Sequence, residues 1–142
     1  MEWIATRAQI GKQTLYRRGV SKSDLVHAAL VFAAPPLREP RSGRSPRTTL
    51  LAAFTAHRDV LTGKTAFPSL ETITQLLHEP EMRGVFADAV VNPRVKIVES
   101  ILQDAVDVGE ADPATITPLT ARIGPALIEH HFLVTGEPPN RR

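Results

Sequence analysis

The stretch MEWIATRAQIGKQTLYRRGVSKSDLV, residues 1–26, is the most informative part of this sequence. Residues 1–8 predict a short helix with one apolar face, and Gly11 predicts a tight turn. Residues 12–18 predict a second short helix whose face is polar and basic. Two short helices joined by a tight turn are typical of a helix-turn-helix, whose second helix enters the major groove of DNA. The sequence therefore predicts a partial helix-turn-helix head over residues 1–34.

Helical signals continue through the rest of the chain, and strand signals are nearly absent. Ser21 or Ser23 is expected to cap a helix that stops at Pro35-Pro36. Residues 35–47, rich in proline and arginine, predict a flexible linker. Apolar residues then recur at helical spacing, which predicts a helical-bundle C-terminal domain over residues 48–142. The fold class expected is all-α, with about seven helices.

Glycine and proline mark the expected ends of the helices in this C-terminal domain. Asn92-Pro93 is expected to open a helix over about 93–108, because asparagine caps well and proline fits a first turn. A last long helix is expected over about 114–134, and Pro125 within it predicts a kink or a break. Glycine is expected to end three helices, at Gly63, Gly109 and Gly136.

Charge is distributed unevenly along the chain. The formal net charge is +2, but residues 1–50 hold nine lysines and arginines against three acidic residues. The remainder holds eight basic and twelve acidic residues. A basic head on an acidic body is the electrostatic layout of a module that binds a polyanion. Alternatively, the arginines between Arg38 and Arg47 belong to a solvated loop and inflate the count.

Several classes of protein and site are excluded by the composition. The chain has no cysteine, so disulfides and thiolate metal sites are excluded. No apolar run reaches the roughly 18 residues of a membrane span, and the N-terminus is unlike a secretory signal, so a cytoplasmic protein is expected. Glu129-His130-His131 cannot converge on one metal ion, because neighbours on a helix point about 100° apart. No catalytic constellation stands out, so we expect no enzyme, no metal and no cofactor.

Two segments resemble the TetR family of transcriptional regulators. IGKQTLYRR at residues 10–18, followed by SKSDLV at residues 21–26, is similar to the helix-turn-helix core of that family. Gly124-Pro125 and LVTGEP at residues 133–138 resemble the last helix of the C-terminal regulatory domain in one subgroup. The resemblance covers nearly the whole chain. It implies a ligand-responsive repressor that binds a palindromic operator in double-stranded DNA as a homodimer.

The resemblance and the motif together suggest roles for particular residues. The N-terminal residues of the second helix are expected to face base edges, and neighbouring polar residues are expected to hold phosphates. The candidate DNA-binding residues are Gln9, Lys12, Gln13, Thr14, Tyr16, Arg17 and Lys22. The last two long helices are expected to pair with their copies in a second chain, through Val95, Val98, Leu102, Ile123, Leu127 and His131.

A pocket for an apolar small molecule is also implied between the middle helices of the C-terminal domain. Its candidate lining residues are Phe54, Phe67, Leu76, Phe86 and Ile128. The same apolar positions, and those assigned to the dimer, are alternatively explained as core residues of a single chain. The sequence identifies no particular effector.

The main departure from the TetR pattern is at the N-terminus. Members of the family carry a further helix before the residues that match 1–8, and we expect it to be missing here. Trp3, Leu15 and Leu25 would then lose apolar cover, at roughly 1.5–3 kcal/mol for each side chain of that size. We therefore expect a head of marginal stability. The alternative to a DNA-binding regulator is a truncated one that only dimerises and binds a small molecule.

Overall fold

A computed structural model describes residues 21–36 and 44–139 of the chain. These residues form six α-helices, one π-helix and one 3₁₀-helix, and none of them lies in a strand. The all-α prediction is therefore confirmed. In chain order the elements are α3 (Lys22–Ala33), α4 (Pro46–Leu61), α5 (Leu70–Leu76), α6 (Pro80–Phe86), η1 (Ala87–Val91), α7 (Asn92–Asp107), η2 (Pro113–Thr115) and α8 (Thr120–Thr135).

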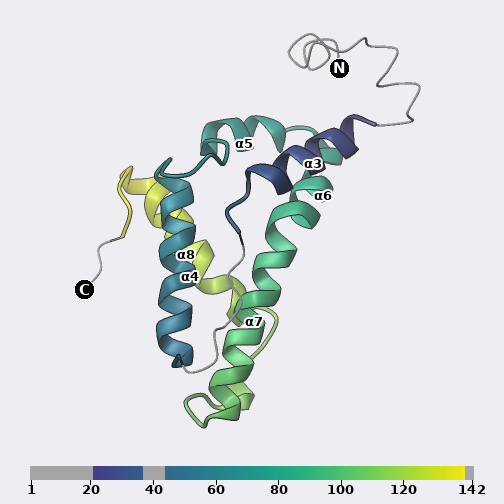
Figure 1. The fold of residues 1–142 in the computed structure, drawn as a ribbon. Coiled ribbons are helices and arrows are strands. Elements are labelled where there is room, and N and C mark those ends of the chain that lie inside the picture. The colour runs from purple at the N-terminus through teal and green to yellow at the C-terminus, as the bar shows by residue number, and fades with distance from the viewer. Residues whose placement is uncertain (1–20, 37–43, 140–142) are drawn as a thin grey trace.

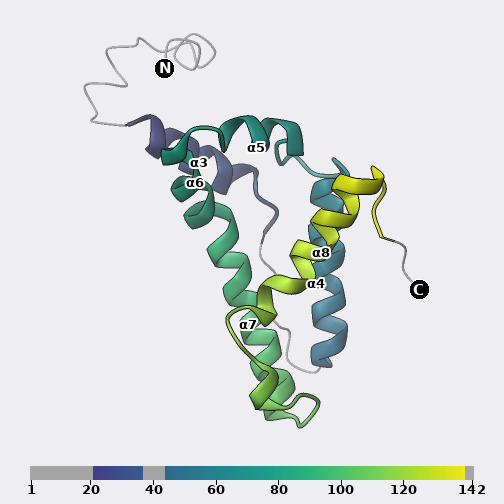
Figure 2. The same ribbon diagram turned by 180° about the vertical axis from the view of Figure 1, so that it is seen from behind.

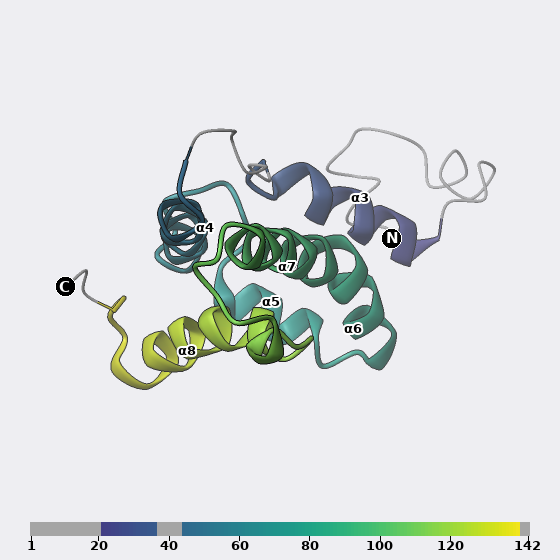
Figure 3. The same ribbon diagram turned by 90° about the horizontal axis from the view of Figure 1, so that it is seen from below.

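One long helical segment links two groups of packed helices. Elements α6, η1 and α7 follow one another without a break, so residues 80–107 form a continuous helical rod (Figure 1). Near the start of this rod, α3 contacts α6 and η1, and α5 lies close by (Figure 2). Further along it, α4, α7 and α8 contact one another pairwise. Figure 3 shows α4 end-on beside α7, with α8 and α3 on opposite sides of α7.

Serine side chains cap the starts of three helices. The Ser21 hydroxyl accepts a hydrogen bond from the Asp24 backbone N–H at 3.1 Å, and the Asp24 carboxylate accepts from the Ser21 backbone N–H at 2.9 Å. This reciprocal arrangement is a capping box. The hydrogen bond from the Ser21 backbone N–H lowers the pKa of the Asp24 carboxyl, and so does a second one, which the Ser21 hydroxyl donates to the same carboxylate at 2.8 Å. Ser45 and Ser69 cap α4 and α5 through their hydroxyls, which accept from the backbone N–H groups of Thr48 and Thr72.

The expected helix ends agree with the structure at all three glycines. Gly63, Gly109 and Gly136 have φ values of 70°, 76° and 72°, the left-handed conformation that glycine adopts without strain. The helix that ends before Gly63 is α4, and it starts at Pro46, inside the predicted linker 35–47. The cap at Ser45 and the fixed φ of proline explain this earlier start.

The helix predicted over about 93–108 is present as α7, but the prediction that Asn92 caps it is wrong. The backbone is already helical before Asn92, whose N–H donates to the Ala87 carbonyl five residues earlier. The Asn92 side chain donates to the Asp88 carboxylate at 3.1 Å instead of capping a helix. Proline has no N–H and clashes with the carbonyl four residues before it in a regular α-helix. The wider turn of η1 accommodates Pro93 within one continuous rod.

The predicted last helix over 114–134 starts too early, and of the kink or break predicted at Pro125 the break is wrong. Residues 113–115 form η2, and α8 begins only at Thr120. Thr117 and Thr120 cap each other there, because each backbone N–H donates to the other hydroxyl at 3.2 Å. Pro125 lies inside α8, which continues to Thr135.

Two sets of apolar side chains form the interior of the described part of the chain. The first joins α3, α5 and η1, and its buried members are Leu30, Ile73, Ala89 and Val90. The second comes from α7 and α8, and its buried members are Val98, Ile101, Ala105 and Ala121. Met82 of α6 is fully buried as well. No polar or charged residue is buried among residues 21–36 and 44–139.

Candidate functional site

The start of α3 is the only part of the predicted DNA-binding surface that the structure describes. Lys22 is the first residue of this helix, and its side chain is 47% exposed. Its ammonium nitrogen Nζ donates to Glu79 Oε2 at 2.5 Å. Lys22, which is predicted to bind a DNA phosphate, is thus held in an ion pair with Glu79 across the α3–α6 contact. The other six candidates, Gln9, Lys12, Gln13, Thr14, Tyr16 and Arg17, lie outside the described residues.

A second polar contact accompanies this ion pair. The Ser23 hydroxyl donates to the Glu81 carboxylate. Glu79 stands immediately before α6 and Glu81 lies in its first turn, where carboxylates are favoured by the free N–H groups of the helix. The starts of two helices therefore meet through two side-chain pairs. Neither glutamate was singled out from the sequence, because nothing in the periodicity indicates that residues 22 and 79 are neighbours.

The five predicted pocket residues lie in three different parts of the structure. Phe67, Leu76 and Phe86 are partly buried and pack against the cluster of Leu30, Ile73, Ala89 and Val90. The structure thus brings these three together as part of the core between α3, α5 and η1. Phe54 lies on α4, where its ring faces Gly124 of α8. Ile128 is the only one of the five that lines the pocket described next.

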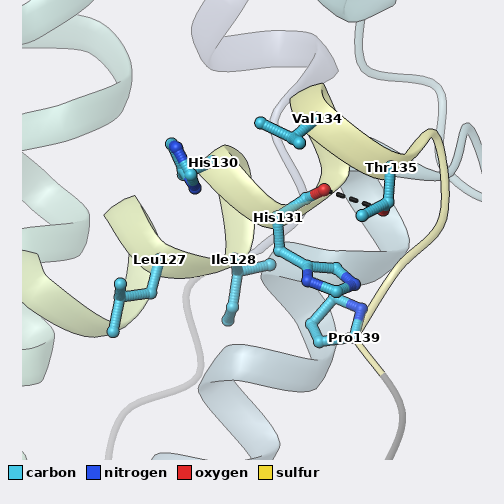
Figure 4. A pocket seen from close by; sticks show the side chains of 7 residues that line it. All are labelled: Leu127, Ile128, His130, His131, Val134, Thr135 and Pro139. Carbon is cyan, nitrogen blue, oxygen red and sulfur yellow. Dashed lines mark hydrogen bonds between the residues drawn. The ribbon is translucent and has the colours of Figure 1, made fainter.

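An open surface pocket of about 420 Å³ lies at the C-terminal end of α8 (Figure 4). It is bounded by the helix and by the segment that follows it, and the Thr135 hydroxyl donates to the His131 carbonyl at 2.8 Å beside it. Ring and aliphatic groups dominate its wall, with two histidines among them. The lining residues are Leu127, Ile128, His130, His131, Val134, Thr135 and Pro139.

One face of α8 carries large apolar side chains that nothing in the described chain covers. Ile123, Leu127 and Val134 are 48%, 63% and 71% exposed, and Leu119 just before the helix is 66% exposed. Residues 119, 123, 127 and 134 recur at helical spacing and so lie along one stripe. The opposite face of α8, with Ala121, is buried against the protein. His130 and His131 are exposed beside the stripe.

The predicted dimer residues therefore divide into two kinds. Ile123, Leu127 and His131 are exposed on α8. On α7, Val95 and Leu102 are half-buried along one flank, while Val98 is only 6% exposed and belongs to the core of the single chain. Exposed apolar surface is thus concentrated on α8, and α7 offers a partly covered flank.

The α4–α8 contact brings together residues that the sequence did not pair. A Cβ added at Gly124 would lie 2.8 Å and 2.9 Å from Cε2 and Cε1 of Phe54, so the ring packs directly on the helix backbone. One turn further along each helix, His57 Nε2 lies 3.2 Å from Glu129 Oε1, close enough for an ion pair but not aligned for a hydrogen bond. A glycine inside a helical apolar pattern was the available signal for this close approach.

Arg94 is a half-buried cation at the junction of η1 and α7. Its guanidinium donates to the Val90 carbonyl at 2.9 Å, and no carboxylate of the described chain lies within ion-pair distance. Burial lowers the pKa of Arg94. The role of the Arg94 side chain in the structure is its hydrogen bond to a carbonyl of the π-helix.

No group of three potential ligands in the described residues could hold a metal ion. None of the helices in this part of the chain is long and apolar enough to cross a membrane.

Comparison with known proteins places this fold in a family. The family model described as the tetracyclin repressor-like C-terminal domain matches residues 40–142, which is more than half of the chain. Uncharacterized HTH-type transcriptional regulators from Mycobacterium bovis and from two strains of Mycobacterium tuberculosis are each 27% identical to it over 139 residues. Each match covers 97% of this chain and 68% of the relative. No solved structure gives a significant match. The helical architecture and the family match together show that the protein belongs to the TetR family of transcriptional regulators.

Proposed function

We propose that this protein is a homodimeric, ligand-responsive repressor that binds a palindromic operator through its N-terminal residues. The observation that carries the proposal is the uncovered apolar stripe on α8. A helix face with four large exposed apolar side chains is unusual on a monomer and is typical of an interface. A second copy of the same chain suits it, because a two-fold axis lets one stripe meet its own copy.

The proposed mode of DNA binding requires a dimer. Helix-turn-helix regulators read two half-sites about 34 Å apart, and this requires two heads held at a fixed spacing. Stable interfaces bury about 1,200–2,000 Å² in total. The α8 stripe together with the half-buried flank of α7 at Val95 and Leu102 offers two helices from each chain toward such an area.

An effector would act on the same region of the protein. The pocket of about 420 Å³ beside α8 falls in the size range of small-molecule sites, about 300–1,000 Å³. A ligand there would touch Leu127 and His131, which belong to the proposed dimer surface. It could therefore change the spacing of the two heads, provided that it binds the two spacings with different affinities.

Replacing Leu127 by Asp is expected to weaken dimerisation by about 30-fold or more, since central apolar residues of an interface contribute about 2 kcal/mol or more. The fold should survive, because the side chain is 63% exposed in the single chain. Sedimentation equilibrium of the L127D variant measures the dissociation constant directly.

Leu51→Asp is the matched control, because Leu51 is 52% exposed and lies on α4, so it is not part of the stripe. It should leave the association unchanged. A wild-type protein that sediments as a monomer, or equal weakening by both variants, would rule out the α8 interface.

DNA binding is tested on the complete chain with its own promoter fragment and a mixed-sequence duplex. Preference for the promoter, with affinity that falls steeply as salt rises, is the expected result. L127D should lose most of the promoter preference, because a monomer engages only one half-site. A dimer that binds neither duplex would instead identify a dimerisation module without DNA-binding activity.

A further inference from the structure

The contact between the starts of α3 and α6 places a carboxylate where the proposed function needs a phosphate. Lys22 Nζ and Glu79 Oε2 are 2.5 Å apart, and both side chains are about half exposed. A carboxylate and a phosphate oxygen are alternative acceptors for the same ammonium group. Lys22 is the described candidate for a phosphate contact in the proposed function, on which this inference rests.

From this arrangement we propose that Glu79 is an intramolecular competitor of the DNA backbone for Lys22. In the state described here Lys22 is bound to the body, and in the DNA-bound state it is bound to phosphate. A phosphate that approaches Lys22 also meets the negative charge of Glu79, which repels it at short range. DNA therefore has to displace the Glu79 carboxylate from Lys22, and the affinity for DNA is lowered by that exchange.

The surrounding charges favour the body-bound state. Glu81, which accepts from Ser23, and Asp24, which accepts from Ser21, lie at the same pair of helix starts and add negative charge to the region of the Lys22–Glu79 pair. The Ser23–Glu81 hydrogen bond holds the neighbouring residue of α3 against α6. The arrangement fixes the first turn of α3 by two side-chain contacts, one to the N-cap residue of α6 and one to its first turn.

Through this competition, a movement of the C-terminal helices can change the affinity of the protein for DNA. Glu79 is joined directly to α6, and α6 continues through η1 into α7, which contacts α8. A position of this rod that keeps Glu79 in contact with Lys22 keeps DNA binding weak, and a shift that withdraws Glu79 strengthens it. Glu79 is thus a regulatory residue that touches the DNA-binding side chain itself.

The test compares DNA affinity of the complete wild-type chain with that of Glu79→Gln, using a mixed-sequence duplex over a range of salt concentrations. E79Q is expected to bind about three- to tenfold more tightly at low salt, and the difference should shrink as salt screens the charges. The dependence of log affinity on log salt should steepen by up to about one, since no displaced carboxylate takes up a cation when Lys22 of E79Q binds a phosphate.

Two controls separate competition for Lys22 from a general effect of charge. Glu110→Gln removes an equal charge from an exposed turn after α7 and should change the affinity less than twofold. In a Lys22→Gln background, Glu79→Gln should lose its effect, because the group for which Glu79 competes is gone. Circular dichroism verifies that each variant keeps the helical fold.

Each outcome bears on a separate claim. If the wild-type chain binds DNA and E79Q gives no gain, the competition is refuted and the proposed function stands. An equal gain from E110Q, or a full gain in the K22Q background, also refutes it, since the effect is then general electrostatics. If neither the wild-type chain nor E79Q binds any duplex at low salt, the proposed function fails and this inference fails with it.

Discussion

Replacing Gly124 by Ala is expected to destabilise the protein by about 2–3 kcal/mol, as overpacked core positions do. The sign is the reverse of the usual one, because Gly→Ala inside a helix generally stabilises by about 0.5–1 kcal/mol. The reason is the ring of Phe54. A Cβ at position 124 would lie within 2.9 Å of Cε1 and 2.8 Å of Cε2, and closer still to Cζ. Either the ring or the whole of α8 must move.

Urea unfolding of the G124A variant at one fixed protein concentration measures this loss. Gly84→Ala is the matched control, since Gly84 lies in α6 and a Cβ there meets nothing within 4 Å. It should stabilise the protein by about 0.5–1 kcal/mol. Adding Phe54→Leu to G124A should recover part of the loss, because leucine lacks the ring tip. A stabilising G124A would show that α4 and α8 are not in this close contact.

Replacing Ile101 by Ala is expected to lower the free energy of unfolding by about 2–5 kcal/mol, the range for truncating a large buried aliphatic side chain. Ile101 is 1% exposed on α7, in the group of helices formed by α4, α7 and α8. Its loss removes apolar contact and leaves a cavity that the surrounding helices fill only in part. Thermal unfolding at constant protein concentration gives the change through the shift in Tm.

Leu51→Ala serves as the control for Ile101. Leu51 is 52% exposed on α4, so its truncation should change stability by no more than about 0.5 kcal/mol. A loss below about 1 kcal/mol for I101A would mean that residue 101 does not lie in the interior of the fold.

Much of the fold was predictable from the sequence, because the decisive signals are local. Serine before a helix and glycine after it act within a few residues, and so the ends at Gly63, Gly109 and Gly136 were predicted correctly. The errors arose where one local rule had two outcomes. Proline is compatible with a first helical turn and with a wide turn inside a helix, and at Pro93 the second applies.

The candidate site was less predictable, because it depends on contacts between distant parts of the chain. Apolar periodicity identified Phe67 and Leu76 as inward-facing, but it could not distinguish a cavity wall from a packed core. The partner of Lys22 is 57 residues away, and the ring that meets Gly124 is 70 residues away. Neither pairing has a periodicity or motif that would reveal it in a single sequence.

The wide turn at residues 87–91 also sets the angular phase between the two halves of the long rod. Ala89 and Val98, each about 6% exposed, are nine residues apart, which is about two and a half turns of a regular α-helix. An unbroken α-helix would point them in opposite directions. The wide turn contains one extra residue without adding its share of rotation, about 100°. The direction of Val98 is therefore closer to that of Ala89 than it would be in a regular α-helix. Deleting a single residue from 87–91 would therefore convert the wide turn into a regular α-helical turn, and Val98 and Ile101 would keep their direction relative to Ala89.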